Sequence, residues 1–292
     1  MLSQIVVNII IAASLYLLIS KSFSIVFFTA KFFDITQAGI ISFAAYFAFL
    51  FYKQIGFDFW LTVITSILLA ASLGVIVEII FYKYLQKVNA DSLVLFITSL
   101  GIYIVFQNAI SLIWGNSARS INAGEIKVGN EIFGGYITTT QLIAICTSIV
   151  LFIGSSLFIN NSRTGKKMRA ISSNAKLSYI FGIDYKSVLL CSYFIGSALG
   201  AVAGLLVAFD TGITPTMGFN LLLSGIVVVI IGGIGSDWGL IGGSLLLAIA
   251  QNLIAYYLSS QWMNAIAYVI LILFLIWKPL GFSGKRLKKI EI

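Results

Sequence analysis

Histidine is absent from this sequence of 292 residues, and only two cysteines are present. Because histidine is the commonest proton shuttle and a frequent metal ligand, its absence argues against a metalloenzyme or a histidine-based pump. Nucleophilic sets such as Ser/His/Asp and Cys/His cannot form either. Cys146 and Cys191 both lie in apolar runs, so we expect them to be small core residues without a bridge. We therefore expect no catalytic residues and no metal site.

A motif for binding ATP is also missing. No GxxxxGK[ST] phosphate loop occurs in the sequence. The nearest fragment, RTGKK at residues 163–167, lacks the first glycine and the hydroxyl residue after the lysine. We expect that the chain does not bind ATP by itself, holds no cofactor and is not an enzyme.

Charged residues and prolines are scarce. Charged residues make up 10% of the chain, there are 2 prolines, and hydrophobic residues make up 60%. This composition, with a mean hydropathy of +1.04, predicts an all-α polytopic membrane protein. The apolar runs are continuous rather than alternating, which excludes a barrel. The net charge of +8 is spread over loop ends, so it does not indicate nucleic acid.

The charged residues divide the chain into apolar runs that are each long enough to cross a bilayer. The runs are 2–20, 35–52, 59–82, 92–114, 136–159, 187–209, 218–234, 239–258 and 262–277. About nine spans are therefore expected, and eight or ten remain possible. Residues 21–34 are too charged for an ordinary span and too apolar for a solvated loop, so we expect a broken or half-inserted segment there. The N-terminus has no basic region of the signal-peptide kind and is expected to be a retained span.

Lysine and arginine bias predicts the orientation. The loop after the third run, residues 160–186 and the C-terminal tail are rich in basic residues, so they are expected in the cytoplasm. The tail contributes Lys278, Lys285, Arg286, Lys288 and Lys289. Alternation then places the N-terminus outside and the C-terminus inside, which nine spans satisfy.

Glycines mark two features of the second half. Gly196, Gly200 and Gly204 recur every four residues and form a ridge that another helix can approach closely, either within the chain or in a second subunit. Further on, the stretch IGGIGSDWGLIGG predicts a helix break at Gly232, Gly233 and Gly235.

Several polar residues lie near or inside the apolar runs. Asp34, Glu78 and Asp210 lie near predicted span ends, where interfacial anchoring is the favoured interpretation and a functional role is the alternative. A path for a polar solute is one interpretation of the deeper polar groups, and hydrogen bonding between helices is the other. The candidates for such a path are Asp34, Gln37, Thr98, Gln107 and Asn108.

Residues 160–186 form the only long polar stretch. Its first part is basic, and membrane headgroups account for most of that charge. In its second part, Asn174 is a candidate N-cap, apolar residues follow at helical spacing, and Gly182 is a candidate C-terminal stop. A short surface helix suited to docking is predicted.

The sequence resembles the permease subunits of branched-chain amino acid ATP-binding-cassette transporters, specifically the shorter of the two paired permeases. The resemblance covers nearly the whole chain and begins with FFDITQAGIISFAAYFAF at residues 32–49. It continues through LVLFITSLGIYIVFQN, WGNSARS, the basic segment, PTMGF, IGGIGSDWGLIGG and WKPLGFSG. Where that family usually has His-Gly-Glu, this chain has Gln37-Ala38-Gly39, which leaves the solute open among branched-chain or other amino acids, urea and short amides.

The resemblance implies a single transmembrane permease domain over residues 1–292, of the type II-like importer kind, in the inner membrane of a bacterium. It implies a second permease subunit, identical or different, two cytoplasmic ATPase subunits, a substrate-binding protein and membrane lipid as partners. Within residues 160–186, it implies contact with the ATPase. The residues so implied are Asn174, Ala175, Lys176, Ile180, Gly182, Ile183 and Asp184.

A secondary carrier or channel for a small polar solute such as urea or an amide, which works without ATPase subunits, is the main alternative. Such a protein normally shows buried coupling-ion acids at mid-membrane or matching broken helices in two inverted halves. Neither feature is evident here. A purely structural membrane subunit is a third option, which the docking-like segment disfavours.

Overall fold

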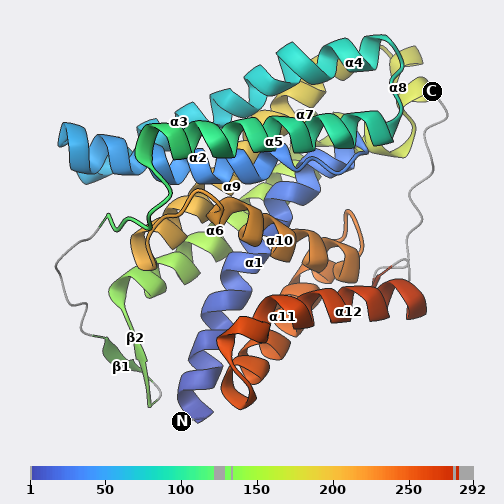
Figure 1. The fold of residues 1–292 in the computed structure, drawn as a ribbon. Coiled ribbons are helices and arrows are strands. Elements are labelled where there is room, and N and C mark those ends of the chain that lie inside the picture. The colour runs from blue at the N-terminus through green and yellow to red at the C-terminus, as the bar shows by residue number, and fades with distance from the viewer. Residues whose placement is uncertain (1, 122–128, 133, 279–280, 283–292) are drawn as a thin grey trace.

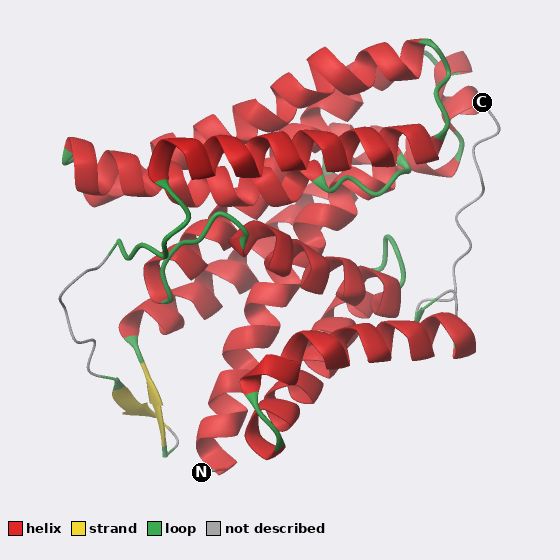
Figure 2. Cartoon of the chain, in the orientation of Figure 1, coloured by secondary structure: helices red, strands yellow, loops and turns green. Residues whose placement is uncertain are grey.

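A computed structural model describes residues 2–121, 129–132, 134–278 and 281–282. The basic tail residues from Lys285 onward, which were predicted to be cytoplasmic, lie outside the described residues. Helices make up almost all of the described chain (Figure 2), as predicted for an all-α membrane protein.

The first half contains four long helical segments. These are α1 (Leu2–Ala30), α2 (Thr36–Phe49) with its π-helical end η1 (Leu50–Ile55), α3 (Phe59–Val77), which continues through η2 (Glu78–Tyr82) into α4 (Lys83–Lys87), and α5 (Ser92–Trp114). A hairpin of β1 (Asn130–Ile132) and β2 (Gly135–Ile137) follows. This antiparallel pair was not predicted from the sequence. Each strand has three residues, and Glu131 lies opposite Tyr136.

The second half contains five long helices and three short ones. These are α6 (Thr139–Asn161), α7 (Arg163–Ser173), α8 (Ala175–Ile180), α9 (Tyr185–Asp210), α10 (Met217–Gly232), α11 (Asp237–Tyr257), η3 (Ser260–Trp262) and α12 (Met263–Trp277). Polar residues begin several of the helices. Thr138, for example, accepts from the Gln141 amide while the Gln141 side chain accepts from the Thr138 amide, which satisfies two free donors.

Seven of the described helices are long and apolar enough to cross a membrane, and α10 and α12 are shorter apolar helices of 16 and 15 residues. At 1.5 Å per residue, a helix of that length reaches roughly 24 Å, which is less than the hydrocarbon thickness. Each of the nine predicted runs nevertheless corresponds to one apolar helix. The prediction of a broken segment at residues 21–34 was wrong, because α1 continues without interruption to Ala30. Burial of Lys21 inside the protein lets the helix carry this charge.

Helix α1 crosses the middle of the molecule (Figure 1) and packs against α6, α9, α10 and α11. Helix α9 packs in turn against α1, α2 and α3, and α1 and α9 are the most deeply buried of the seven long helices. The glycine ridge of α9 lies in these contacts: Gly196 faces Ser22 and Val26 of α1, and Gly204 faces Ile41 of α2. The ridge therefore serves packing within the chain.

Contacts between loops group the helix ends into two sets. The "basic end" comprises residues 31–35, 83–91, 163–184 and 233–236, and the Lys31 amine donates to Ser172 Oγ there at 2.9 Å. The "hairpin end" comprises residues 2–4, 115–121, 130–132, 134–137 and 211–216. There the Gln4 amide donates to the Tyr136 carbonyl at 3.1 Å, and Arg119 pairs with Ile213. Five of the long helices run between these two ends, namely α1, α5, α6, α9 and α10.

Candidate functional site

Helix α7 anchors the polar segment to the helix bundle. Ser162 caps it by accepting from the Gly165 amide at 2.9 Å. Met168 and Ile171 are buried and pack with Val188 of α9. The basic residues of α7 are exposed: Arg163, Lys166, Lys167 and Arg169. This helix was not predicted from the sequence, although the spacing of its buried Met168 and Ile171 is a helical signal.

Helix α8 follows where a short helix was predicted. Asn174 Oδ1 accepts from the Leu177 amide at 3.0 Å, which is the geometry of an N-cap. Gly182 has φ +74°, and its amide donates to the Tyr179 carbonyl at 3.0 Å. That left-handed conformation suits glycine and stops the helix after Ile180.

Asp184 begins α9 immediately after this stop. Its carboxylate accepts from the Lys186 amide at 3.1 Å and from Ser187 Oγ at 2.5 Å. The Ser187 hydrogen bond, followed by backbone hydrogen bonds and Lys186, lowers the pKa of this exposed carboxyl. Ile183 is half-buried beside Val188, and Ala175 packs in the same cluster. The side chain of Lys176 is outside the described set.

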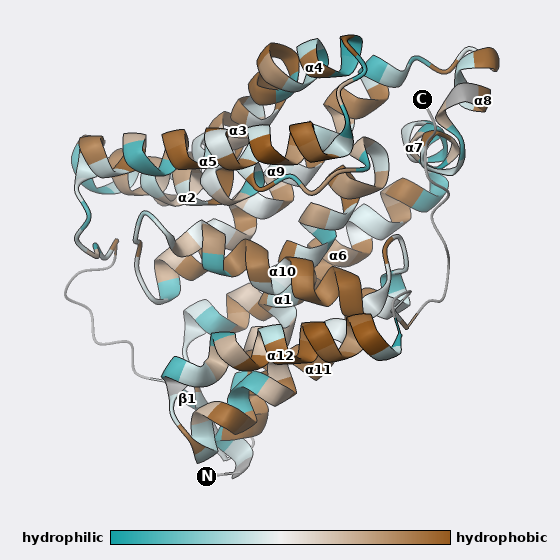
Figure 3. Ribbon diagram, turned by 45° about the vertical axis from the view of Figure 1, so that its right-hand side comes forward, coloured by the Kyte–Doolittle hydropathy of each residue, from teal (hydrophilic) through white to brown (hydrophobic). Residues whose placement is uncertain are grey.

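Apolar side chains on and after α8 project away from the bundle. Tyr179, Ile180 and Phe181 are 77%, 77% and 76% exposed, and Leu177 is 50% exposed. Figure 3 shows α8 beyond the bundle, next to α7 and on the same side as α4. An apolar surface of this kind, on a short rigid helix at the end of the bundle, is suited to a partner's groove.

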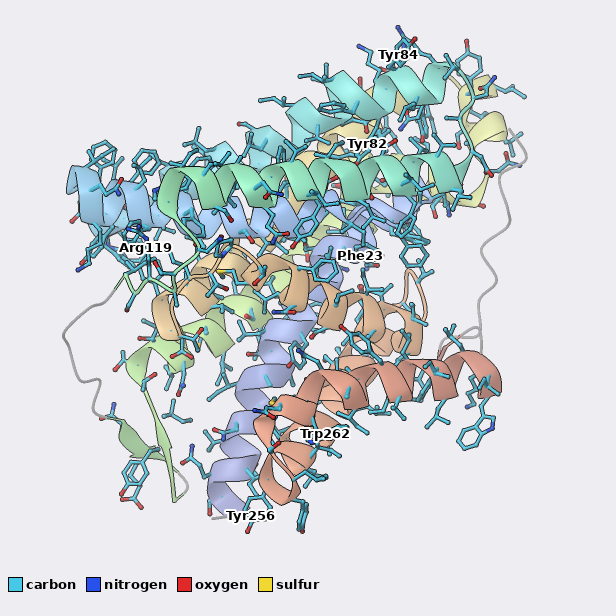
Figure 4. All side chains as sticks on the ribbon, in the orientation of Figure 1. Phe23, Tyr82, Tyr84, Arg119, Tyr256 and Trp262 are labelled. Carbon is cyan, nitrogen blue, oxygen red and sulfur yellow. The ribbon has the colours of Figure 1, made fainter. Side chains whose placement is uncertain are left out.

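The turn between α1 and α2 lies beside α7, where Lys31 contacts Ser172. Asp34 Oδ1 accepts from the Thr36 amide at 2.9 Å and from the Tyr82 hydroxyl at 2.7 Å. Figure 4 shows Tyr82 on the inner side of its helix and Tyr84 at the outer edge. Burial raises the pKa of the Asp34 carboxyl to about 6 and lowers the pKa of Lys31 to about 8. Asp34 therefore holds the turn inside the protein instead of anchoring it at an interface.

The five predicted path residues do not form one cluster. Asp34 and Gln37 are buried, and the Gln37 side-chain amide donates to Ser197 Oγ at 3.3 Å. Thr98 and Asn108 lie on α5 and donate to carbonyls of their own helix, at 2.8 Å each. Gln107 is partly buried on the same helix. Gln37 thus bonds to another helix, whereas Asn108 is exposed.

A helix break separates α10 from α11. Helix α10 ends at Gly232, and Gly233 and Gly235 have φ +89° and +80°. Gly232 lies against the backbone of Gly239, so a side chain at either position would collide with the backbone of the other helix. Asp237, which follows the break, pairs with Lys21 Nζ at 2.5 Å. Sequence reasoning missed this pair, because the two residues are 216 positions apart.

Metal-ligating groups are not gathered anywhere in the described residues, since no cluster of three or more His, Cys, Asp or Glu occurs there. Both cysteines are free; Cys146 is exposed and Cys191 is partly buried. The candidate site at the basic end consists of the exposed apolar side chains on and after α8 and the buried polar turn at Asp34.

Comparisons with known proteins give the same fold and a family. The family model described as "Branched-chain amino acid transport system / permease component" matches residues 5–275. The high-affinity branched-chain amino acid transport system permease protein LivH of Escherichia coli is 32% identical over 235 residues, which cover 77% of this chain and 76% of LivH. The corresponding permease BraD of Pseudomonas aeruginosa is 30% identical, with 75% and 73% covered.

A solved structure with a similar fold is also found. PsaBC from Streptococcus pneumoniae in complex with Fab matches with a TM-score of 0.55 at 13% identity, covering 96% of this chain and 93% of that chain. At this identity the match supports the arrangement of helices alone. The family match, which covers most of the chain, together with relatives at 30% identity or more, shows that the chain belongs to the branched-chain amino acid transport system permease family.

Proposed function

We propose that this chain is the permease subunit of an ATP-driven importer of branched-chain or other amino acids, with ATP hydrolysed by separate subunits. The observation that carries the proposal is the exposed apolar surface of Leu177, Tyr179, Ile180 and Phe181, presented by a capped helix at the basic end. Membership of the family and the names of LivH and BraD support the substrate class.

The basic end is proposed to face the cytoplasm. Basic residues are concentrated there, in α4 and α7 and at Lys31, and the positive-inside rule places such loops on the cytoplasmic side. The N-terminus then lies outside with the hairpin, and the last described residues lie inside, where the Phe282 amide donates to the Ile231 carbonyl at 2.9 Å. This orientation puts α8 where a cytoplasmic ATPase can reach it.

Residues 160–186 are proposed to be the coupling segment. The Asn174 cap, the Gly182 stop and the Asp184 cap hold α8 at a fixed angle, and α7 ties it to α9 through Met168 and Ile171. The Lys31 hydrogen bond to Ser172 joins the same segment to the turn after α1. Movement of an ATPase against α8 would therefore be transmitted to α1 and α9, the two most buried helices.

The solute path is proposed to run along α5, between this chain and a second permease, identical or different. Helix α5 exposes Ile97, Ile104, Val105 and Leu112, with Asn108 among them. A second permease would cover the apolar residues and leave the polar groups to line a path. A substrate-binding protein would deliver the solute at the hairpin end.

The docking surface can be tested by copurification. A Tyr179→Ala, Ile180→Ala and Phe181→Ala triple variant should lose association with the partner ATPase by at least about tenfold, because exposed aromatic and aliphatic residues dominate such contacts. The matched control replaces three other consecutive exposed residues, Tyr256, Tyr257 and Leu258, which lie at the end of α11. Equal retention of the ATPase by both variants would refute the proposed docking role of α8.

A further inference from the structure

A large cleft at the basic end adjoins the coupling segment, and Tyr179 and Ile180 of the exposed apolar surface form part of its wall. Its volume is about 1690 Å³. It is bounded by the end of α1, by η2 and α4, by the start of α5, by α8 and by the start of α9. Because these are the ends of membrane-spanning helices, the cleft lies at the level where hydrocarbon gives way to headgroups.

The charges in the cleft are mostly positive. Four lysines line it, Lys31, Lys83, Lys87 and Lys186, together with two acids, Glu78 and Asp91. Neither acid forms an ion pair with these lysines, since Lys21–Asp237 is the single ion pair of the chain outside residues 1, 122–128, 133, 279–280 and 283–292, although Lys83 interacts electrostatically with Glu78 over a longer distance. Glu78 is 3% exposed and lies deep in the protein.

One of the acids, Asp91, and one of the lysines, Lys31, already form hydrogen bonds within the protein. Asp91 caps α5 by accepting from the Ser92 amide at 2.7 Å, and Lys31 donates to Ser172. Lys83 is partly buried, whereas Lys87 and Lys186 are exposed. Lys83, Lys87 and Lys186 thus place three ammonium groups around one cleft.

An apolar surface continues from the cleft along the outside of the α3–α4 helix. Ile76, Ile80 and Phe81 are exposed there, and Ile79 is both exposed and part of the cleft wall. Inside the cleft, Phe27, Leu95 and Leu190 add apolar lining. A basic cleft that opens onto an apolar helix face fits a molecule with an anionic head and long hydrocarbon chains.

We propose that this cleft binds the headgroup of an anionic phospholipid, with its phosphate between Lys83, Lys87 and Lys186 and its acyl chains against the α3–α4 face. An ammonium group offers three donors to phosphate oxygens, and each basic side chain near an anionic headgroup adds attraction. An acidic segment of a partner protein would match the charge but not the exposed apolar residues Ile76, Ile80 and Phe81 beside it. The bound lipid would also contact Tyr179 and Ile180 on α8, so its occupancy would bear on the coupling segment.

Native mass spectrometry of the purified full chain tests the proposal, with phosphatidylglycerol as the probe and phosphatidylcholine of the same acyl chains as the neutral reference. Wild type should retain phosphatidylglycerol in preference to phosphatidylcholine. The Lys83→Gln, Lys87→Gln and Lys186→Gln triple variant should bind phosphatidylglycerol at least about tenfold more weakly. The corresponding three arginine substitutions should keep the preference, which shows that the site is still folded.

The matched control is Arg163→Gln, Lys166→Gln and Lys167→Gln on α7, which removes the same charge from exposed residues at the same end. It should keep the preference for phosphatidylglycerol. An equal loss in both triple variants would overturn the proposal in favour of general surface charge. Displacement of the lipid by glycerophosphoglycerol as readily as by intact phosphatidylglycerol would overturn it in favour of a free phosphate ester. Equal binding of both lipids by wild type would also overturn it.

Discussion

Substituting Gly204 by alanine tests the close approach of α9 to α2. A Cβ atom at this position would lie 2.6 Å from the Ile41 carbonyl oxygen and 3.0 Å from Ile41 Cγ2. Because the carbonyl belongs to the backbone of α2, it cannot rotate away, and the two helices must separate. Overpacking of this kind costs about 1–3 kcal/mol. It outweighs the gain of about 0.5–1 kcal/mol that alanine normally brings over glycine inside a helix.

Gly154→Ala on α6 is the matched control, since no atom lies within 4 Å of its added Cβ. The Tm of Gly200→Ala should lie between those of the other two variants, because the nearest atom to its added Cβ, Ser22 Oγ at 2.9 Å, is a side-chain atom that can move. Thermal unfolding in one detergent should give Gly204→Ala a Tm several degrees below that of Gly154→Ala, at about 2–4 °C per kcal/mol. Equal Tm values for these two variants would refute the packing argument.

Three further predictions concern the Lys21–Asp237 ion pair, the Asn174 cap of α8 and the turn at Asp34. Asp237→Asn should lower the Tm by leaving the buried Lys21 ammonium without its partner, and adding Lys21→Met should recover most of the loss; no recovery in the double variant would contradict this explanation. Asn174→Ala should weaken α8 by about 1 kcal/mol and speed amide hydrogen exchange at residues 175–180, whereas unchanged exchange would count against the cap. Because burial raises the pKa of Asp34 to about 6, the wild type should lose stability as the pH rises from about 4 to 6, whereas Asp34→Asn should not. The Tm of the variant relative to that of the wild type should therefore be higher at pH 7 than at pH 4. Parallel dependence of the two Tm values on pH would refute this prediction.

Local patterns account for what the sequence predicted well. Nine apolar runs became nine apolar helices, since each run is long, continuous and bounded by charged or turn-forming residues. The short helix after Asn174 followed from an N-cap, apolar spacing and a glycine stop that lie within nine residues of one another. The break at Gly232 to Gly235 was likewise encoded by neighbouring glycines.

Long-range pairing accounts for what the sequence did not reveal. From the sequence, Lys21 was interpreted as a charge that interrupts a membrane span. Its partner Asp237 lies 216 residues away, and only the fold brings the two residues together. The glycine ridge of α9 was compatible with a contact inside the chain or between subunits, and the positions of Val26 and Ile41 decide for the first. In the same way, Asp34 read as an interfacial anchor until the fold placed Tyr82 beside it.

Reconstitution into lipid vesicles tests whether the chain works as the permease of an ATP-driven importer. The chain would be inserted with its partner permease, the ATPase subunits and the substrate-binding protein, and uptake of radiolabelled leucine would be followed with and without ATP. Uptake should require ATP and the ATPase, and it should fall sharply in the Tyr179→Ala, Ile180→Ala and Phe181→Ala variant. Leucine uptake by the chain alone, at the same rate with and without ATP, would contradict it.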